Sequence, residues 1–295
     1  MTYIHAVGTY NDIPEETQPD LKVELKRLSG KVYRRIDHFI QLAVIGAHKS
    51  VEGVALPERT AIYMTSGQGN ISVFERVRVQ RHMLHLLPKP VDFINLLSNS
   101  AGFYVATHLG LSGKNLFLAH HRFPVQMTLL AAMNDLKLGK QEAVLVGGVD
   151  EWIERQPLAR KLLGVSPETA LGEGSNWMLL SGAEEGAVGR LELRNELLDL
   201  EGLKTALRDF EPGSRVAFSP RFEENVISEL LAANPGLSRY GYEAECAYYE
   251  TLPLYALNRF LETEEGVLFH LDISDGRCRI MRVDNRGFGR REGAI

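Results

Sequence analysis

Residues 114–139 form the stretch whose residue types and spacing most suggest chemistry. Residues 114–121 read KNLFLAHH, and residues 124–139 read PVQMTLLAAMNDLKLG. The first pattern predicts a strand, and the second predicts a helix that Pro124 opens and Gly139 closes. A thiol on such a turn would be activated as a nucleophile by the positive end of the helix. The turn instead carries Arg122, a permanent cation that cannot act as a nucleophile.

Two other pairs of residues are explained better by structure than by chemistry. His120 and His121 are adjacent on the expected strand, so their side chains point to opposite faces and are poorly placed to share one metal ion. Gly147 and Gly148 are followed by no Lys-Ser/Thr pair and lie in no Gly-x-Gly-x-x-Gly pattern. We therefore interpret the histidines as structural or interface residues and the glycines as a tight strand end.

The composition is typical of an ordinary globular protein. Of 295 residues, 44% are apolar and 24% are charged, and the net charge of −5 argues against a nucleic-acid partner. Cys246 and Cys278 form no Cys-x-x-Cys pair, so we expect no metal centre, no disulfide framework and no cofactor. The first residues soon become polar and acidic, unlike a signal peptide, and no apolar run reaches the ~18 residues of a membrane span. These features predict a cytoplasmic protein.

Short apolar runs alternate with helical patterns along the whole chain. In residues 1–186 the expected strands are 3–10, 59–67, 114–121, 142–150 and 174–183, and the expected helices are 34–51, 89–110 and 124–139. In residues 187–295 the expected strands are 189–198, 214–220, 238–243, 266–274 and 277–284, and the expected helices are 200–210, 223–234 and 249–262.

The two lists repeat the same order of elements. Alternating buried strands and helices predict mostly parallel sheets covered by helices on both faces. A repeat of about half the chain predicts two related halves, 1–186 and a shortened 187–295, that pack as one unit. Residues 152–171 show no clear period, so we expect a loop there, with room for a short helix.

Residues 113–151 resemble the β-ketoacyl synthases, the condensing enzymes of fatty-acid and polyketide synthesis. That family has a Gly-x-Asn strand, a cysteine turn, a helix ending in Leu-Gly, and a strand ending in Gly-Gly before an acidic residue. The matching residues stand in the same register without a gap: Gly113, Asn115, Leu138, Gly139, Gly147, Gly148 and Glu151. The stretches RRIDHFIQLAV, INLLSNSAGFYVATHLGLSG and LGEGSNWMLL extend the resemblance over roughly residues 30–180. It implies a thiolase-like fold, in which a duplicated α/β unit forms αβαβα layers with two mostly parallel sheets.

The resemblance also implies that the catalytic residues of the family are missing. In the family register, the nucleophilic cysteine falls on Arg122, which we expect to point away from the helix axis or to meet a carboxylate. The two family histidines would fall near Ser219 and near Cys246, and neither place has a histidine. We interpret Cys246 as an ordinary thiol. The family's glycine-rich gating loop has two candidate counterparts, the turn SDGRC (274–278) and RGFGR (286–290).

A chain with this frame and no catalytic residues resembles the chain-length factors of type II polyketide systems. By that resemblance, it would pair with an active ketosynthase as a heterodimer, would act indirectly with an acyl carrier protein, and would shape the acyl tunnel of its partner. Aryl-polyene synthesis is one plausible setting. By the same resemblance, one set of residues would close the acyl tunnel: Phe74, Val77 and Met83. A second set would lie on the strand that pairs with the partner and on the turn after it: Asn115, Phe117, His120, His121 and Phe123.

Two alternatives remain open at this point. The chain could be a degenerate acyltransferase or thioesterase that uses another nucleophile, which predicts turnover of an acyl thioester by the isolated chain. It could also be a homodimer that binds acyl groups or a carrier protein, which predicts a stable twofold dimer. Residues 74–89, FERVRVQRHMLHLLPK, suit a partly buried interface segment better than a basic recognition helix.

Overall fold

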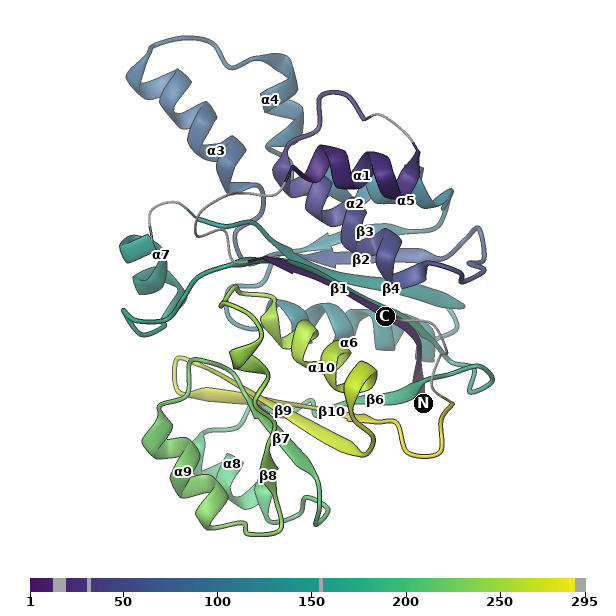
Figure 1. Ribbon diagram of the computed structural model, residues 1–295, viewed down its shortest axis with the longest axis vertical. Helices are drawn as coiled ribbons and strands as arrows, with labels where there is room; N and C mark the ends of the chain where they lie inside the picture. The colour runs from purple at the N-terminus through teal and green to yellow at the C-terminus, as the bar shows by residue number, and fades with distance from the viewer. Residues whose placement is uncertain (13–19, 31–32, 154–155, 290–295) are drawn as a thin grey trace.

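Helices and sheets alternate in five layers along the longest axis of the molecule (Figure 1). This computed structural model describes residues 1–12, 20–30, 33–153 and 156–289. The outer helices of the first half are α1 (Leu21–Ser29), α2 (His38–Val51) and α5 (Asn99–Leu109). The central layer holds α6 (Pro124–Lys137) and α10 (Leu252–Thr263), and the far layer holds α8 (Leu200–Leu207) and α9 (Glu224–Ala232).

The strands between these layers repeat one topology. The first five are β1 (Thr2–Asp12), β2 (Ala61–Thr65), β3 (Asn115–Leu118), β4 (Ala143–Asp150) and β5 (Glu173–Ser181). The second five are β6 (Gly189–Leu193), β7 (Arg215–Phe218), β8 (Ser238–Arg239), β9 (Val267–Ser274) and β10 (Arg277–Asp284). Their order is β3-β2-β4-β5-β1-β6-β10-β9-β7-β8, so the second half repeats the order of the first in reverse across the junction.

In each half the fifth strand runs antiparallel between the first and the fourth, and the other four strands are parallel to one another. The predicted thiolase-like fold class is therefore confirmed. One detail differs from the expectation of two separate sheets. Thr2–Ile4 of β1 pair with Gly189–Leu191 of β6, and this short antiparallel contact joins both sheets into one hydrogen-bonded unit. The division at residue 186 stays a prediction.

Burial on both faces explains the apolar strands of the first half. Every residue of β2 and β4 is buried, because α2 and α5 cover one face of the sheet and α6 and α10 cover the other. The glycine pair at the end of β4 fits this packing. A Cβ on Gly147 would lie 2.4 Å from the ring of Trp177, so Gly147 makes room for a fully buried tryptophan. The interpretation of a tight strand end agrees with this contact.

Several element boundaries differ from the prediction. The single helix expected over 89–110 is two helices, α4 (Pro90–Asn95) and α5. The weak strand expected at 238–243 is reduced to the two residues of β8. Pro253 does not kink α10, because it occupies the first turn, where a missing N–H costs nothing. Residues 152–171 do contain a short helix, α7 (Gln156–Leu163).

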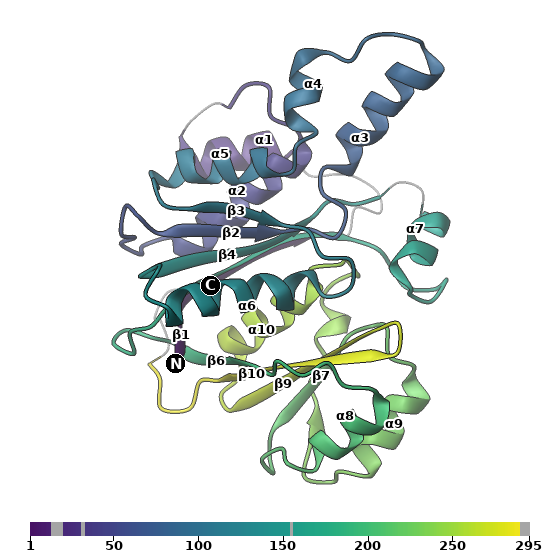
Figure 2. The ribbon, with the colours of Figure 1, turned by 180° about the vertical axis from the view of Figure 1, so that it is seen from behind.

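An arm projects from the first half, built of α3 (Ile71–Arg78), the π-helical turn η1 (Val79–Met83) and α4 (Figure 2). At its base, the side chain of Asn70 donates to Asp37 and to the carbonyl of Asn95, both at 2.8 Å. A second short turn, η2 (Tyr242–Ala244), precedes α10. None of the helices in the described ranges is long and apolar enough to cross a membrane.

Candidate functional site

The turn between β3 and α6 is closed by hydrogen bonds from its own backbone. The N–H groups of Arg122 and Phe123 both point at Nδ1 of His120, at 3.3 and 3.2 Å. Since Nδ1 accepts these bonds, His120 is neutral there with its proton on Nε2. Burial, with the positive charges of Arg279 and Arg122 nearby, lowers the pKa of His120 and favours this neutral state. The backbone donors of the turn are therefore already engaged.

The side chain of Arg122 leaves the helix axis and meets a carboxylate, as expected for a cation near a helix N-terminus. Its Nε lies 2.9 Å from Oδ2 of Asp275, in the turn between β9 and β10. Phe123 beside it is buried, and the guanidinium of Arg279 lies 5.9 Å from the centre of its ring. The turn is thus covered by residues from the second half of the chain.

Arg221 forms an ionic cluster beneath this turn. It pairs with Glu250 and lies 3.8 Å from Asp272, and its Nε donates to the carbonyl of Leu163 at 3.1 Å. A further guanidinium nitrogen lies 3.5 Å from the carbonyl oxygen of Arg122. All three charged side chains are at most 10% exposed. The cluster therefore places one buried guanidinium, paired with two buried carboxylates, below Arg122.

Glu250 and Gln126 complete this cluster. Burial raises the pKa of Glu250 to about 7, while the charge of Arg221 opposes the rise. The amide of Gln126 donates to Oδ2 of Asp272 at 2.8 Å. Removing Arg221 would leave both carboxylates buried without their cation, which is the costly case.

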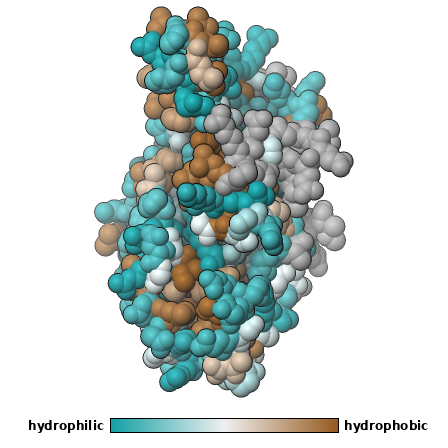
Figure 3. Space-filling model, turned by 90° about the vertical axis from the view of Figure 1, so that its left-hand side faces the viewer, coloured by the Kyte–Doolittle hydropathy of each residue, from teal (hydrophilic) through white to brown (hydrophobic). Residues whose placement is uncertain are grey.

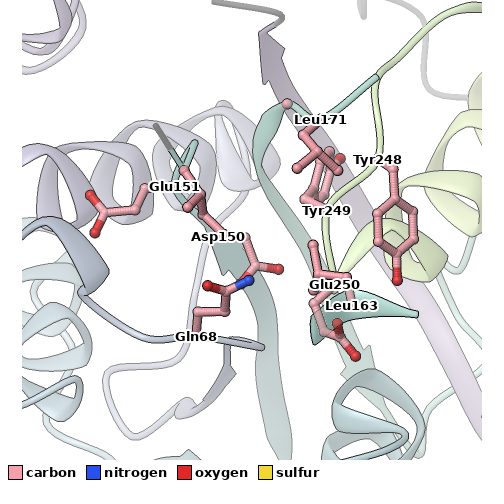
Figure 4. Close-up of a pocket in the computed structure, with 10 residues that line it drawn as sticks. Gln68, Asp150, Glu151, Leu163, Leu171, Tyr248, Tyr249 and Glu250 are labelled. Carbon is pink, nitrogen blue, oxygen red and sulfur yellow. The ribbon is translucent and has the colours of Figure 1, made fainter. Parts of the chain in front are cut away.

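A cavity that Glu250 of this cluster lines is small (Figure 4). Its lining includes Gln68, Asp150, Tyr248 and Glu250, and its volume of about 10 Å³ is room for one water molecule. Asp150 is fixed at its wall, because its carboxylate accepts from Ser66 Oγ at 2.7 Å and from the N–H groups of Gly67 and Thr251 at 2.8 and 2.7 Å. Burial raises the pKa of Asp150. This cavity is too small for an acyl thioester.

The carboxylate of the next residue, Glu151, binds the first helix of the arm. In Figure 4, Glu151 points in the direction opposite to Asp150. It accepts from the N–H and the hydroxyl of Ser72 at 2.6 and 2.9 Å, in the first turn of α3. Burial raises the pKa of Glu151 to about 7. A titratable carboxylate therefore fastens the first helix of the arm to the body.

The positions expected to correspond to the two family histidines hold no ionisable base. Ser219 is buried after β7, and its hydroxyl has no partner among the described residues. Cys246 is buried, its Sγ lies 3.7 Å from the carbonyl of Tyr242, and burial raises its pKa to about 12. A thiol with that pKa is protonated at neutral pH and is a poor nucleophile. The nearest histidine, His270, lies buried inside β9, and burial lowers its pKa to about 4.

The arm carries several of the exposed large apolar residues of the described chain. Phe74 and Met83, two of the expected tunnel residues, are 51% and 65% exposed, whereas Val77 is half-buried. Figure 3 shows hydrophobic residues gathered at the end of the molecule that the arm forms. The exposed apolar residues of η1, α4, α5 and the links between them are Met83, Leu84, Leu86, Leu87, Phe93, Ile94, Leu97 and Phe103.

Strand β3 lies at the end of the strand order and pairs only with β2 among the described strands. Asn115 is exposed and Phe117 is half-buried, while His120 and His121 are exposed just beyond the strand. The open edge of β3 therefore presents unpaired backbone groups beside the apolar surface of α5.

Solved structures with the same arrangement identify the fold. A scan of protein-family models found no match, and a search of curated protein sequences found none either. The ishigamide ketosynthase/chain length factor matches with a TM-score of 0.74 and 14% identity, over 97% of this chain and 99% of that chain. A β-ketoacyl synthase from Burkholderia phymatum STM815 matches with a TM-score of 0.66 and 12% identity, over 96% and 99%. The chain has the ketosynthase fold.

A third ketosynthase match comes from a complex. The structure entitled "AntDE:AntF (apo): type II PKS acyl-carrier protein in complex with its ketosynthase bound to the hexaketide" matches with a TM-score of 0.66 and 12% identity, over 96% of this chain and 99% of that chain. At this level of identity the likeness establishes the fold and leaves the activity to be argued from the residues.

Within the ketosynthase fold, the structure brings together residues that the sequence did not connect. The turn containing Asp275 reaches Arg122, whereas Phe288, in the second candidate for the gating loop, lies with its ring centre 6.3 Å from that of Tyr3. The turn SDGRC, and not the described part of RGFGR, therefore covers the turn that carries Arg122; Arg290 lies outside the described residues. Arg221 and Glu250 were missed. The only available signal was an arginine and a glutamate close to the places where the family histidines would fall.

Proposed function

We propose that this chain is a catalytically silent ketosynthase-like subunit, comparable to a chain-length factor, that pairs with an active β-ketoacyl synthase. The observation that carries the proposal is the pairing of Arg122 with Asp275 above the Arg221 cluster, at the position where the sequence resemblance would place the nucleophile. Acyl transfer from a thioester needs a thiolate at that turn to attack the carbonyl carbon and free backbone N–H groups to stabilise the oxyanion. The turn offers a guanidinium, and its N–H groups are directed at His120.

The partner would dock on the open edge of β3 and on the arm. An exposed strand edge is a template for pairing with another chain, and a contiguous apolar surface beside it marks an interface. Asn115, Phe117, His120 and His121 would lie at the pairing strand, while Arg122 and Phe123 would keep this chain's own pocket sealed. Two matching structures, a ketosynthase/chain length factor and an acyl-carrier protein in complex with its ketosynthase, favour this kind of assembly.

In such a pair the arm would help to shape the acyl tunnel of the active subunit. Phe74 and Met83 are exposed enough to reach a partner, and Val77 lies between them. The product would belong to fatty-acid or polyketide-type synthesis, with aryl polyenes as one setting, and the acyl carrier protein would act on the pair through the active subunit.

Co-expression with a ketosynthase encoded beside this chain tests the proposal. We expect a one-to-one complex by size exclusion with mass measurement, and condensation only when both chains are present. A stable homodimer that ignores the synthase would overturn the proposal in favour of a homodimeric acyl- or carrier-binding protein. Hydrolysis or transfer of an acyl thioester by the isolated chain would instead support the degenerate enzyme.

A further inference from the structure

A chain of three hydrogen-bonding side chains joins α2 to α5 away from the site described above. Nδ1 of His48, on α2, lies 3.0 Å from Nε2 of His108, on α5. The two rings meet edge to face with their centres 5.1 Å apart. On the other side of His108, Nδ1 lies 2.6 Å from the hydroxyl of Tyr33. Both histidines line an open groove of about 550 Å³.

The protonation states of the two histidines decide whether these hydrogen bonds form. A hydrogen bond between two imidazole nitrogens needs one nitrogen with its proton and one without. In the neutral pair, Tyr33 donates to Nδ1 of His108, and Nε2–H of His108 donates to Nδ1 of His48. One added proton is accommodated by reversing both bonds, so that His48 donates to His108 and His108 donates to the oxygen of Tyr33. A second added proton places N–H groups on both facing nitrogens, and the bond between the rings is lost.

We propose that the hydrogen-bonded contact between His48 and His108 fastens α5 to α2 and is controlled by protonation. The contact holds when the pair of histidines carries at most one added proton, and it opens when the pair carries two. Among the described residues, charged groups near this contact lie on α1, on α2 and just after α2. Glu52 follows α2 and lines the same groove. Glu24 of α1 lies 3.7 Å from Lys49 of α2 and also pairs with Arg27, so two cations share this one carboxylate. On α5 itself, His108 is the only titratable residue besides Tyr104.

Movement of α5 would reach the open edge of the sheet. A Cβ on Gly102 of α5 would lie 2.4 Å from the side-chain oxygen of Asn115, so the helix and β3 touch without a gap. Leu109, after His108, and Phe117 of β3 pack against one apolar cluster. Opening of the histidine contact would therefore weaken the pairing edge in acid. This last consequence rests on the proposed function, whereas the contact itself does not.

The test uses the isolated chain, so that its outcome is independent of any ketosynthase. Imidazole signals followed by NMR during a pH titration should show that each protonation step changes the signals of both His48 and His108, as expected for a coupled pair. In His48→Asn, the amide oxygen replaces Nδ1 as the acceptor and cannot titrate. This variant should lose less of its melting temperature between about pH 7.5 and about pH 5 than the wild type. His108→Gln should behave likewise.

His82→Asn, at an exposed histidine of the arm, is the matched control and should keep the wild-type pH profile. Independent titration of the two histidines would overturn the proposal, as would an unchanged pH profile in both variants. The facing nitrogens could also bind a transition-metal ion. Stabilisation of the wild type by added Zn²⁺, absent from both variants, would replace the proton contact with a metal site.

Discussion

Nε of Arg122 lies 2.9 Å from Oδ2 of Asp275, so the turn that opens α6 is tied to the turn between β9 and β10. Both side chains are about half exposed, which makes the pair weak in energy, at about 0–1 kcal/mol. Its importance is positional. It holds the second half of the chain over the β3–α6 turn, where the sequence resemblance would place the nucleophile of a ketosynthase, and Arg221 lies beneath the same turn.

Restoring the cysteine alone should not restore chemistry. Arg122→Cys places a thiol at the turn, but the backbone donors remain bound to His120, and no histidine stands near Ser219 or Cys246. We expect no acyl-enzyme by intact-mass measurement after incubation with an acyl thioester, and a stability within about 1 kcal/mol of the wild type. An active ketosynthase labelled under the same conditions is the positive control. Stoichiometric acylation of the variant would contradict a sealed site.

The Arg221 cluster should be a major determinant of stability. Arg221→Met leaves Glu250 and Asp272 buried without their cation, which should cost about 3–5 kcal/mol in chemical denaturation. The double variant with Glu250→Gln should recover part of this loss, because one uncompensated charge is gone. The loss in the single variant should also shrink in acid, where Glu250 is protonated. Additive effects of the two substitutions would show that the residues do not interact.

The first half was the more predictable from sequence, for a physical reason. Strands such as β2 and β4 are buried on both faces, so their apolar runs are unbroken, and the register from Gly113 to Glu151 contains no gap. The break between α4 and α5 was missed, although Ser98, Asn99 and Ser100 are polar, weak helix formers of the kind that often begin a new helix. The ionic cluster was missed for another reason. Arg221, Glu250 and Asp272 meet only through tertiary packing, which leaves no periodic trace in a single sequence.

The buried side chain of His270 should make the stability of the fold depend on pH. Neither ring nitrogen of His270 has a partner among the described residues, and burial lowers its pKa to about 4. A histidine with a lowered folded pKa stabilises the fold fully above about pH 6.5, and this stability is lost as the pH falls toward 4. His270→Leu should remove that loss, on the order of 3 kcal/mol, and should also be more stable at neutral pH because no polar group is left unpaired. His121→Leu, at an exposed position, should leave the pH profile unchanged; a similar profile for both variants would contradict this account.

The carboxylate of Glu151, which fastens α3 to the body, should give the opposite pH dependence of stability. Burial raises the pKa of Glu151 to about 7, so its protonated form favours the folded state. Its contribution is present below about pH 4.5 and is lost as the pH rises to about 7. Glu151→Gln imitates the protonated acid and should be more stable than the wild type at about pH 8, but similar to it near pH 4. Melting curves at both pH values measure this difference, and equal stability at the higher pH would show that Glu151 is not destabilised by its burial.

The arm should contribute to pairing and little to folding. Leu87 and Phe93 are 82% and 62% exposed, so Leu87→Ser and Phe93→Ser remove apolar surface that contacts little within the chain. We expect melting temperatures close to that of the wild type and a loss of affinity for the ketosynthase of about 1 kcal/mol or more for each central position, measured by titration of the purified chains. Leu162→Ser on α7, where Leu162 is 75% exposed but lies off the arm, is the matched control. If this control weakens pairing as much as the arm variants do, the partner binds elsewhere and the arm has no special part in assembly.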